Sequence, residues 1–101
     1  MAKPKRLPPI PPGEILAEEF MKPNAISQNR LARDIDVSPA RVNDIVHGRI
    51  AITAATALRL AKYFGTTPEL WMNLQASYEL RLARATAWPR IEPRVRVLAA
   101  E

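Results

Sequence analysis

Two helix-start signals lie close together near the middle of the chain, and they constrain the fold more than any other feature. Ser27 can cap a helix, and Ser38-Pro39 repeats the signal with proline at the first helical position. Apolar residues recur at helical spacing after each signal: Leu31, Ala32 and Ile35, then Val42, Ile45 and Val46. Gly48 ends the second segment. The stretch therefore predicts two short helices, joined by a tight turn plugged by Val37, that bury their apolar sides.

This layout is that of a helix-turn-helix, in which the second helix lies in the DNA major groove. With its apolar side in the core, the second helix presents one outward face: Ser38, Ala40, Arg41, Asn43, Asp44 and His47. Arginine can bridge two acceptors of guanine, asparagine can bridge adenine, and alanine can contact the thymine methyl. Asp44 is unfavourable near phosphate unless it accepts a hydrogen bond from cytosine or orients Arg41. The alternative interpretation is a solvated helix face without a ligand.

The charge of the chain favours an acidic partner. The 101 residues carry a net charge of +5, with a sequence pI near 10.2, which suits nucleic acid but does not specify a fold. The surplus is uneven along the sequence. Residues 27–49 hold four arginines against three aspartates, whereas residues 80–101 hold five arginines against two glutamates. A basic surface on this protein therefore depends partly on how the C-terminal residues lie.

The sequence lacks the residues that several classes of function require. There is no cysteine, which excludes disulfides and thiolate sites, and His47 is the only histidine. Asp34 and Asp36 are two residues apart on a helix and do not face each other. No apolar run approaches the ~20 residues of a membrane span. We therefore expect a cytoplasmic protein that is not an enzyme, with no metal, cofactor or membrane partner.

The rest of the chain predicts more helices and two tails. Residues 1–11 form a Pro/Lys-rich extended arm, residues 12–87 the helical domain, and residues 88–101 a basic tail. Three further helices are expected: Pro12 to Lys22, a Thr53-capped helix through Phe64, and Thr67-Pro68 to Ala85 or Ala87. The residues expected to face the core are Ile15, Leu16 and Phe20 in the first of these helices. In the second they are Ala57, Leu58, Leu60, Ala61 and Phe64, and in the third they are Leu70, Trp71, Leu74, Tyr78 and Leu82. Pro89 and Pro93 argue against more helix, and residues 94–97 alternate weakly like a strand. The predicted fold is all-α with five helices.

Three segments resemble one family. PPGEILAEEF (residues 11–20), ISQNRLARDIDVSPARVNDIVHGRIAIT (26–53) and TALRLAKYFGTTPELWMNLQASYEL (56–80) are similar to the HigA (VapI-type) antitoxins. These belong to the XRE, or Cro/CI repressor, class. The third segment is the most specific, because general repressors of the class do not need its Trp71-Met72-Asn73-Leu74-Gln75. The likeness covers about residues 11 to 82.

The resemblance implies a dimer that binds a palindromic operator and represses its own operon, and that neutralises a HigB-type mRNA endonuclease toxin. Base-reading positions of the class carry over onto Ser38, Ala40, Arg41, Asn43 and Asp44. Phosphate donors carry over onto Ser27, Gln28 and Asn29 at a helix start, and Arg49 suits a second phosphate clamp. This chain departs from the class at Pro39-Ala40, where a long polar residue is usual, so Arg41 and its neighbours must supply more specificity.

Two protein contacts complete the expectations. The end of the fifth helix and the tail carry spare apolar residues for a homodimer contact: Leu80, Leu82, Trp88, Val95, Val97 and Leu98. The resemblance alone motivates a toxin contact through Glu14, Glu18 and Glu19, with the N-terminal arm, and the alternative is a solvated acidic face. Two other functions remain open: a stand-alone XRE-type regulator, or a protein-interaction module without DNA binding that uses Trp71 and Tyr78. The salt dependence of binding separates DNA binding from a purely protein contact. Phosphate binding weakens steeply as salt rises, whereas a mainly apolar protein contact does not.

Overall fold

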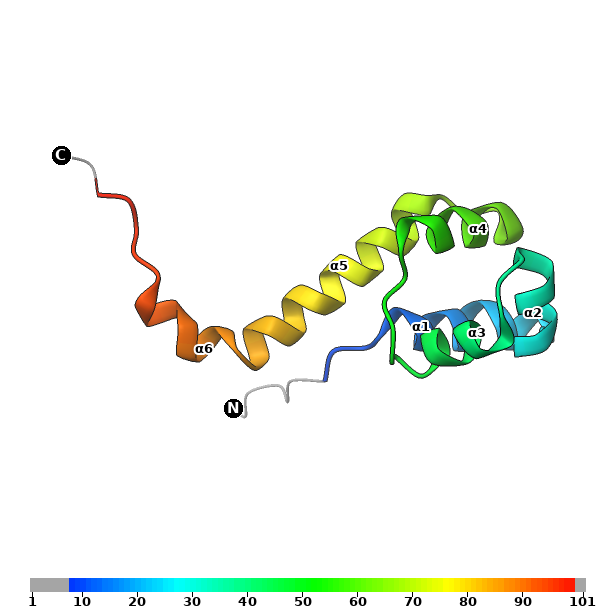
Figure 1. Ribbon diagram of the computed structural model, residues 1–101, viewed down its shortest axis with the longest axis horizontal. Coiled ribbons are helices and arrows are strands. Elements are labelled where there is room, and N and C mark those ends of the chain that lie inside the picture. The colour runs from blue at the N-terminus through cyan, green and yellow to red at the C-terminus, as the bar shows by residue number, and fades with distance from the viewer. Residues whose placement is uncertain (1–7, 100–101) are drawn as a thin grey trace, which may run out of the picture.

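The computed structural model describes residues 8–99, and these form an all-helical arrangement (Figure 1). In chain order the elements are α1 (Pro12–Ile15), the π-helix η1 (Leu16–Met21), the 3-10 helix η2 (Lys22–Asn24), α2 (Gln28–Ile35), α3 (Pro39–Val46), α4 (Ala54–Phe64), α5 (Pro68–Ala85), α6 (Trp88–Ile91) and the 3-10 helix η3 (Glu92–Arg94). No strand occurs between residues 8 and 99. The all-α prediction is confirmed, with a short sixth helix added.

Four predicted helix starts are confirmed by their capping hydrogen bonds. The hydroxyl of Ser27 accepts from the backbone N–H of Arg30 at 3.1 Å, and that of Ser38 accepts from Arg41 at the same distance. The hydroxyls of two threonines cap α4 and α5 in the same way: Thr53 and Thr67. Each cap satisfies one of the backbone donors left free at a helix start. The helix-turn-helix therefore begins and ends where the sequence pattern places it.

The core lies among α1, η1 and α2 to α5. Its fully buried large side chains come from η1, from α2 to α5 and from the loop before α4: Leu16, Leu31, Val42, Ile52, Leu60 and Trp71. The indole N–H of Trp71 donates to the hydroxyl of Thr66 at 2.8 Å, and the Phe20 ring packs on the indole with centroids 4.9 Å apart. Trp71 thus belongs to the protein's own core and offers no exposed anchor for a partner.

Two predictions about the first and fourth helices are wrong. The segment after Pro12 is not one α-helix to Lys22, because it widens into η1 and tightens into η2. Pro23 lies inside η2, and the helical run ends at Ala25, whose φ of 53° is left-handed. Leu58 is 60% exposed rather than inward, because α4 buries the side formed by Ala57, Leu60 and Ala61.

The C-terminal segment also differs from its prediction. Pro89 and Pro93 do not prevent helix, because each lies in the first turn of its element, where a backbone N–H has no partner to lose. Residues 95–99 form no strand. The second half of α5 carries α6 and η3 away from the helix-turn-helix (Figure 1), and the described part of the chain extends 56 × 40 × 23 Å. Leu82, expected inward, is 39% exposed on this projecting part.

Candidate nucleic-acid interface

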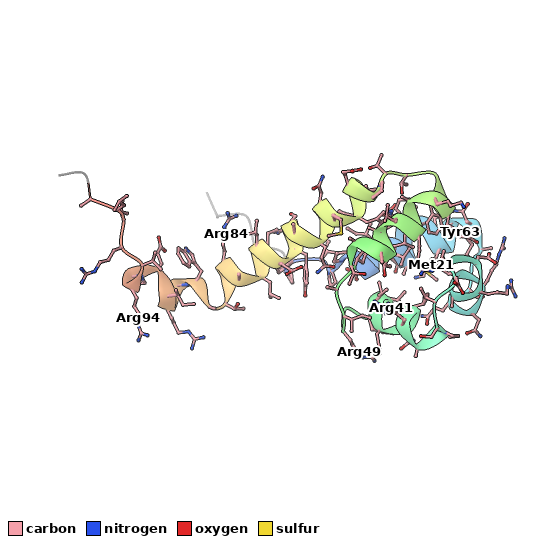
Figure 2. All side chains as sticks on the ribbon, turned by 45° about the horizontal axis from the view of Figure 1, so that its top comes forward. Met21, Arg41, Arg49, Tyr63, Arg84 and Arg94 are labelled. Atoms are coloured by element: carbon pink, nitrogen blue, oxygen red, sulfur yellow. The ribbon has the colours of Figure 1, made fainter. Side chains whose placement is uncertain are left out.

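The outward face of α3 is set by the burial of its opposite face. Val42 and Ile45 are 1% and 2% exposed, which turns the remaining side of α3 toward solvent. Ser38, Ala40 and Arg41 are all exposed there. The Arg41 side chain (labelled in Figure 2) has no hydrogen bond or ion pair with any residue between 8 and 99. Its guanidinium group is therefore available for an outside acceptor.

Asn43 has both ends of its amide engaged within the protein. Its Nδ2 donates to Oε1 of Gln28, on α2, at 2.9 Å. Its Oδ1 accepts from Nη1 of Arg49 at 3.0 Å. Gln28 and Asn43 are both half-buried, so this contact fixes the start of α2 against the middle of α3. In this state Asn43 positions its neighbours, and each end of its amide keeps one further hydrogen-bonding site.

Asp44 pairs with Arg49 and not with Arg41. The Arg49 Nη1 lies 3.2 Å from the Asp44 carboxylate, and the two side chains are 59% and 41% exposed. The alternative that Asp44 orients Arg41 is therefore not what the structure shows. Pairing with Arg49 offsets the negative charge that Asp44 would otherwise bring to a phosphate-facing surface. His47 lies beside them, with its Nδ1 2.8 Å from the carbonyl oxygen of Asn43.

Three of the four predicted phosphate-binding residues lie at the start of α2, and the fourth, Arg49, follows α3. Ser27 uses its oxygen to cap α2, but a hydroxyl group can still donate one hydrogen bond. Gln28 accepts from Asn43 through its oxygen, which leaves its amide N–H₂ as a donor. Asn29 is exposed. Together with the free backbone N–H groups and the positive end of the α2 dipole, these donors can bind an anion.

The sequence does not predict the series of contacts that runs from Gln28 through Asn43 and Arg49 to Asp44. Fifteen residues separate Gln28 from Asn43, and their contact depends on how α2 and α3 cross. The Asp44–Arg49 pair carries a signal, since opposite charges five residues apart flank the end of α3. A close approach between α1 and α3 is equally hidden. Gly13 is buried, and a β-carbon added there would overlap the carbonyl oxygen of Ile45.

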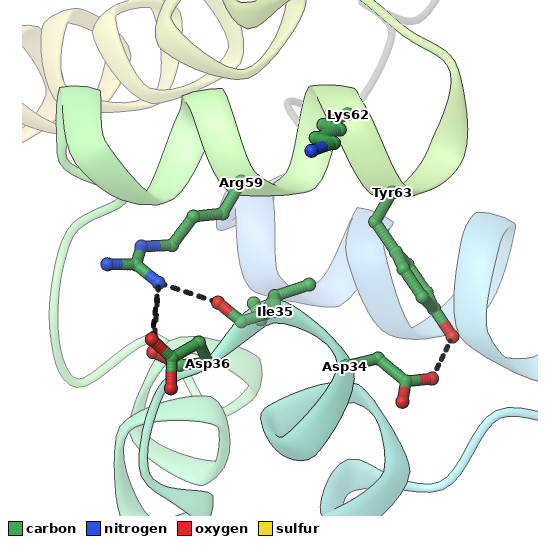
Figure 3. A pocket seen from close by; sticks show the side chains of 6 residues that line it. All are labelled: Asp34, Ile35, Asp36, Arg59, Lys62 and Tyr63. Atoms are coloured by element: carbon green, nitrogen blue, oxygen red, sulfur yellow. Dashed lines mark hydrogen bonds and ion pairs between the residues drawn. The ribbon is translucent and has the colours of Figure 1, made fainter.

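A second polar cluster lies between α2 and α4 (Figure 3). The hydroxyl of Tyr63 donates to Oδ2 of Asp34 at 2.7 Å. This hydrogen bond is the main cause that lowers the pKa of Asp34, with the nearby Arg33 and Arg30 acting in the same direction. The same bond raises the pKa of Tyr63. Asp36 turns instead toward Arg59, 3.8 Å away, so Asp34 and Asp36 do not converge on a common site.

The acidic residues predicted for the toxin contact lie on α1 and η1. Glu14, Glu18 and Glu19 are all exposed. The carboxylate of Glu18 pairs with Nζ of Lys22 at 2.7 Å, which offsets part of the acidic charge. Among residues 8–99, no helix is both long and apolar enough to cross a membrane, and no three potential metal ligands gather in one place.

Comparison with known proteins places this arrangement in a family. A helix-turn-helix family model matches residues 18–71. Virulence-associated protein I of Dichelobacter nodosus is 49% identical over 77 residues, which is 76% of this chain and 71% of the relative. Antitoxin HigA-1 of Vibrio cholerae is 38% identical over 80 residues, or 79% of this chain and 74% of the relative. The chain belongs to the HigA family of helix-turn-helix antitoxins.

A solved HigA structure agrees in fold over nearly the whole chain. The Pseudomonas aeruginosa antitoxin HigA, solved with the higBA promoter, is 45% identical, with a TM-score of 0.86 over 90% of this chain and 99% of that one. The family resemblance that was carried by the three sequence segments is therefore confirmed. The described helices therefore have the fold of a HigA-type antitoxin.

Proposed function

We propose that this chain is an antitoxin and transcriptional autorepressor that binds operator DNA as a dimer and neutralises a HigB-type toxin. One observation carries the DNA part: α3 presents the unpaired Arg41 beside the donor-rich start of α2 and the exposed Arg49. An exposed helix that carries an unpaired arginine, beside hydrogen-bond donors for phosphate, suits binding in the DNA major groove. The solved HigA relative with its promoter supports the same conclusion.

In this proposal the residues divide by what they contact. Base edges are read by a set on α3, with Arg41 contributing most: Ser38, Ala40, Arg41, Asn43 and Asp44. Phosphates are bound by the start of α2 and the residue after α3: Ser27, Gln28, Asn29 and Arg49. Asn43 and Asp44 also hold Arg49 in place, so these two residues link base reading to phosphate binding.

Replacing Arg41 tests the DNA proposal. A bidentate contact between arginine and guanine is worth about 1–3 kcal/mol of discrimination. Arg41→Ala is therefore expected to remove most of the preference for operator over random DNA while leaving helical content unchanged. Footprinting of wild type and variant on the promoter measures the preference, and circular dichroism measures the helices. Unchanged operator preference in the variant would refute the role of Arg41. Lys62→Ala, which removes an exposed cation on α4, is the control.

The dimer contact is proposed for the projecting part of the chain. Leu80 and Trp88 are 54% and 38% exposed and line one shallow apolar hollow with Ala83 and Arg84. Ile91 and Val95 continue the exposed apolar surface, followed by Val97 and Leu98. A chain ended after Ala83 keeps the buried Gln75 and the half-buried Tyr78, so it is expected to fold as a monomer. Sedimentation of a folded dimer of this shortened chain would exclude the proposed contact.

The toxin contact is proposed for the acidic side formed by Glu14, Glu18 and Glu19. Opposite charge speeds encounter with a basic endonuclease more than it tightens the complex. The triple alanine variant is expected to bind the toxin more slowly at low salt and to rescue toxin-expressing cells less well. Glu69→Ala, an exposed acidic residue on α5, is the control. Full rescue with an unchanged association rate would exclude this surface.

A further inference from the structure

The unpaired positive charges of the described chain lie mostly in its projecting part. In the helix-turn-helix body, five cations lie within ion-pair distance of a carboxylate: Lys22, Arg30, Arg33, Arg49 and Arg59. The other two cations of the body, Arg41 and Lys62, have no ion-pair partner within residues 8–99. In the projecting part, all five arginines are exposed and none has an ion-pair partner within residues 8–99: Arg81, Arg84, Arg90, Arg94 and Arg96. The net positive charge that is free to bind an outside partner is therefore concentrated in the projecting part.

The short helical run from α6 into η3 carries both apolar and basic residues. Trp88 and Ile91 are three residues apart and share one side. Arg90 is two residues from Trp88, which places it about 200° around the α-helical part of the run. Glu92 follows Trp88 at the four-residue spacing, so the side that holds Trp88 and Ile91 also carries one carboxylate. Arg90 lies on the other side of α6, and Arg94 is the last residue of the 3-10 helix η3.

Arg94 points toward the same edge of the molecule as Arg49, one of the proposed phosphate-binding residues. In Figure 2 the side chains of Arg94 and Arg49 are directed toward the same edge of the molecule, whereas Arg84 is directed toward the opposite edge. The described chain is 56 Å long, which exceeds the ~34 Å of one DNA turn. For one duplex to contact both α3 and Arg94, it has to run along this axis past the base pairs that α3 contacts.

We infer that Arg90 and Arg94 form a second, sequence-independent contact with the phosphate backbone of the DNA that α3 reads. This inference rests on the proposed operator binding. Guanidinium groups bind phosphate oxygens in bidentate geometry, and two exposed arginines can bind one or two phosphates. Such contacts add affinity and fix the position of the protein on the duplex without carrying sequence information. The recognition helix then supplies specificity while the projecting part supplies general affinity.

The salt dependence of DNA binding tests this contact. Full-length protein is titrated against a promoter duplex and a random duplex of equal length at several salt concentrations. Arg94→Ala is expected to weaken binding to both duplexes by the same factor and to lower the slope of log affinity against log salt by about 0.9. The Arg90→Ala and Arg94→Ala double variant is expected to lower the slope by roughly twice that amount. Arg94→Lys keeps the charge and is expected to keep most of the slope.

Lys62→Ala is the control, since Lys62 is also exposed and unpaired within the described residues but belongs to neither the proposed DNA contacts nor the proposed dimer contact. Its salt slope is expected to equal that of wild type. Three results would overturn the inference: an unchanged slope in Arg94→Ala, equal slope changes in Lys62→Ala and Arg94→Ala, or dissociation of the Arg94→Ala dimer, which would assign the arginine to the second copy. Failure of wild type to prefer the promoter duplex would refute the proposed function instead.

Discussion

The guanidinium group of Arg59, on α4, donates a hydrogen bond to the carbonyl oxygen of Ile35, at the end of α2, at 2.7 Å. The same Nη1 lies 2.9 Å from the carbonyl oxygen of Asp36. The last carbonyl groups of a helix have no partner within it, so Arg59 satisfies two of them (Figure 3). Asp36 has a left-handed φ of 59°, which a residue with a side chain seldom adopts. Arg59 thus fixes the turn that sets α3 against α2.

Removing the Arg59 hydrogen bonds should destabilise the whole domain. Arg59→Ala leaves two carbonyl groups without their charged donor, and hydrogen bonds to charged groups contribute about 1.5–3 kcal/mol. We expect the free energy of unfolding to fall by about 1–3 kcal/mol, measured by urea denaturation. Lys62→Ala, one turn further along α4, should change it by less than about 0.5 kcal/mol. Equal effects of the two substitutions would show that Arg59 contributes only its charge.

The Tyr63–Asp34 hydrogen bond predicts a pH-dependent contribution to stability. The pKa of Asp34 is lowered in the fold, so its contribution is present above the ordinary aspartate pKa and is lost as pH falls through the folded-state pKa. The pKa of Tyr63 is raised, so its contribution is present below the ordinary tyrosine pKa and is lost as pH rises through the folded-state pKa. The stability difference between wild type and Tyr63→Phe should therefore be largest between these limits.

Thermal unfolding across the pH range measures that difference. Tyr78→Phe is the control, because the Tyr78 hydroxyl makes no hydrogen bond with residues 8–99. Its difference from wild type should not follow the pH dependence expected for Tyr63→Phe. A constant Tyr63→Phe difference at all pH values would show that the ring packing, and not the hydrogen bond to Asp34, accounts for the effect.

The sequence predicts this fold well where a signal is local, and poorly where it is not. Ser27 and Ser38 locate α2 and α3 because a cap is a property of a few adjacent residues. Leu58 is exposed although the sequence predicts it inward, because helical spacing cannot tell which of two adjacent apolar residues faces the core. Pro89 lies within α6 although it argues against helix there, because proline stops a helix only beyond its first turn. The Gln28–Asn43 contact has no local signal, since it depends on the crossing of two helices.

Gly13 should be needed to hold the recognition helix in place. A β-carbon there would overlap the backbone of α3 at Ile45, so Gly13→Ala must push α1 and α3 apart. We expect a loss of about 1–3 kcal/mol in stability, the usual cost of overpacking, together with weaker operator binding. Gly65→Ala is the control: it has open space but a φ of 73°, so it should lose some stability through strain and keep its affinity for operator. Normal operator affinity in Gly13→Ala would separate this packing from DNA binding.

Arg49 and Asp44 should act on DNA as a coupled pair. Arg49→Ala removes a phosphate contact and also leaves the Asp44 carboxylate without its partner on the DNA-facing surface. We expect it to weaken operator and random DNA alike and to lower the salt slope by about one. In an Asp44→Asn background the same substitution should cost less affinity, because no unpaired carboxylate then faces the phosphates.

The expected coupling free energy between Arg49 and Asp44 in DNA binding is about 0.5–3 kcal/mol, the range for contacting residues in one network. Fluorescence anisotropy of the four proteins on both duplexes gives this value, with Arg33→Ala as a control for an ion-paired arginine on α2. Additive losses would mean that the pair does not act together on DNA, and a loss confined to the operator would assign Arg49 to base reading.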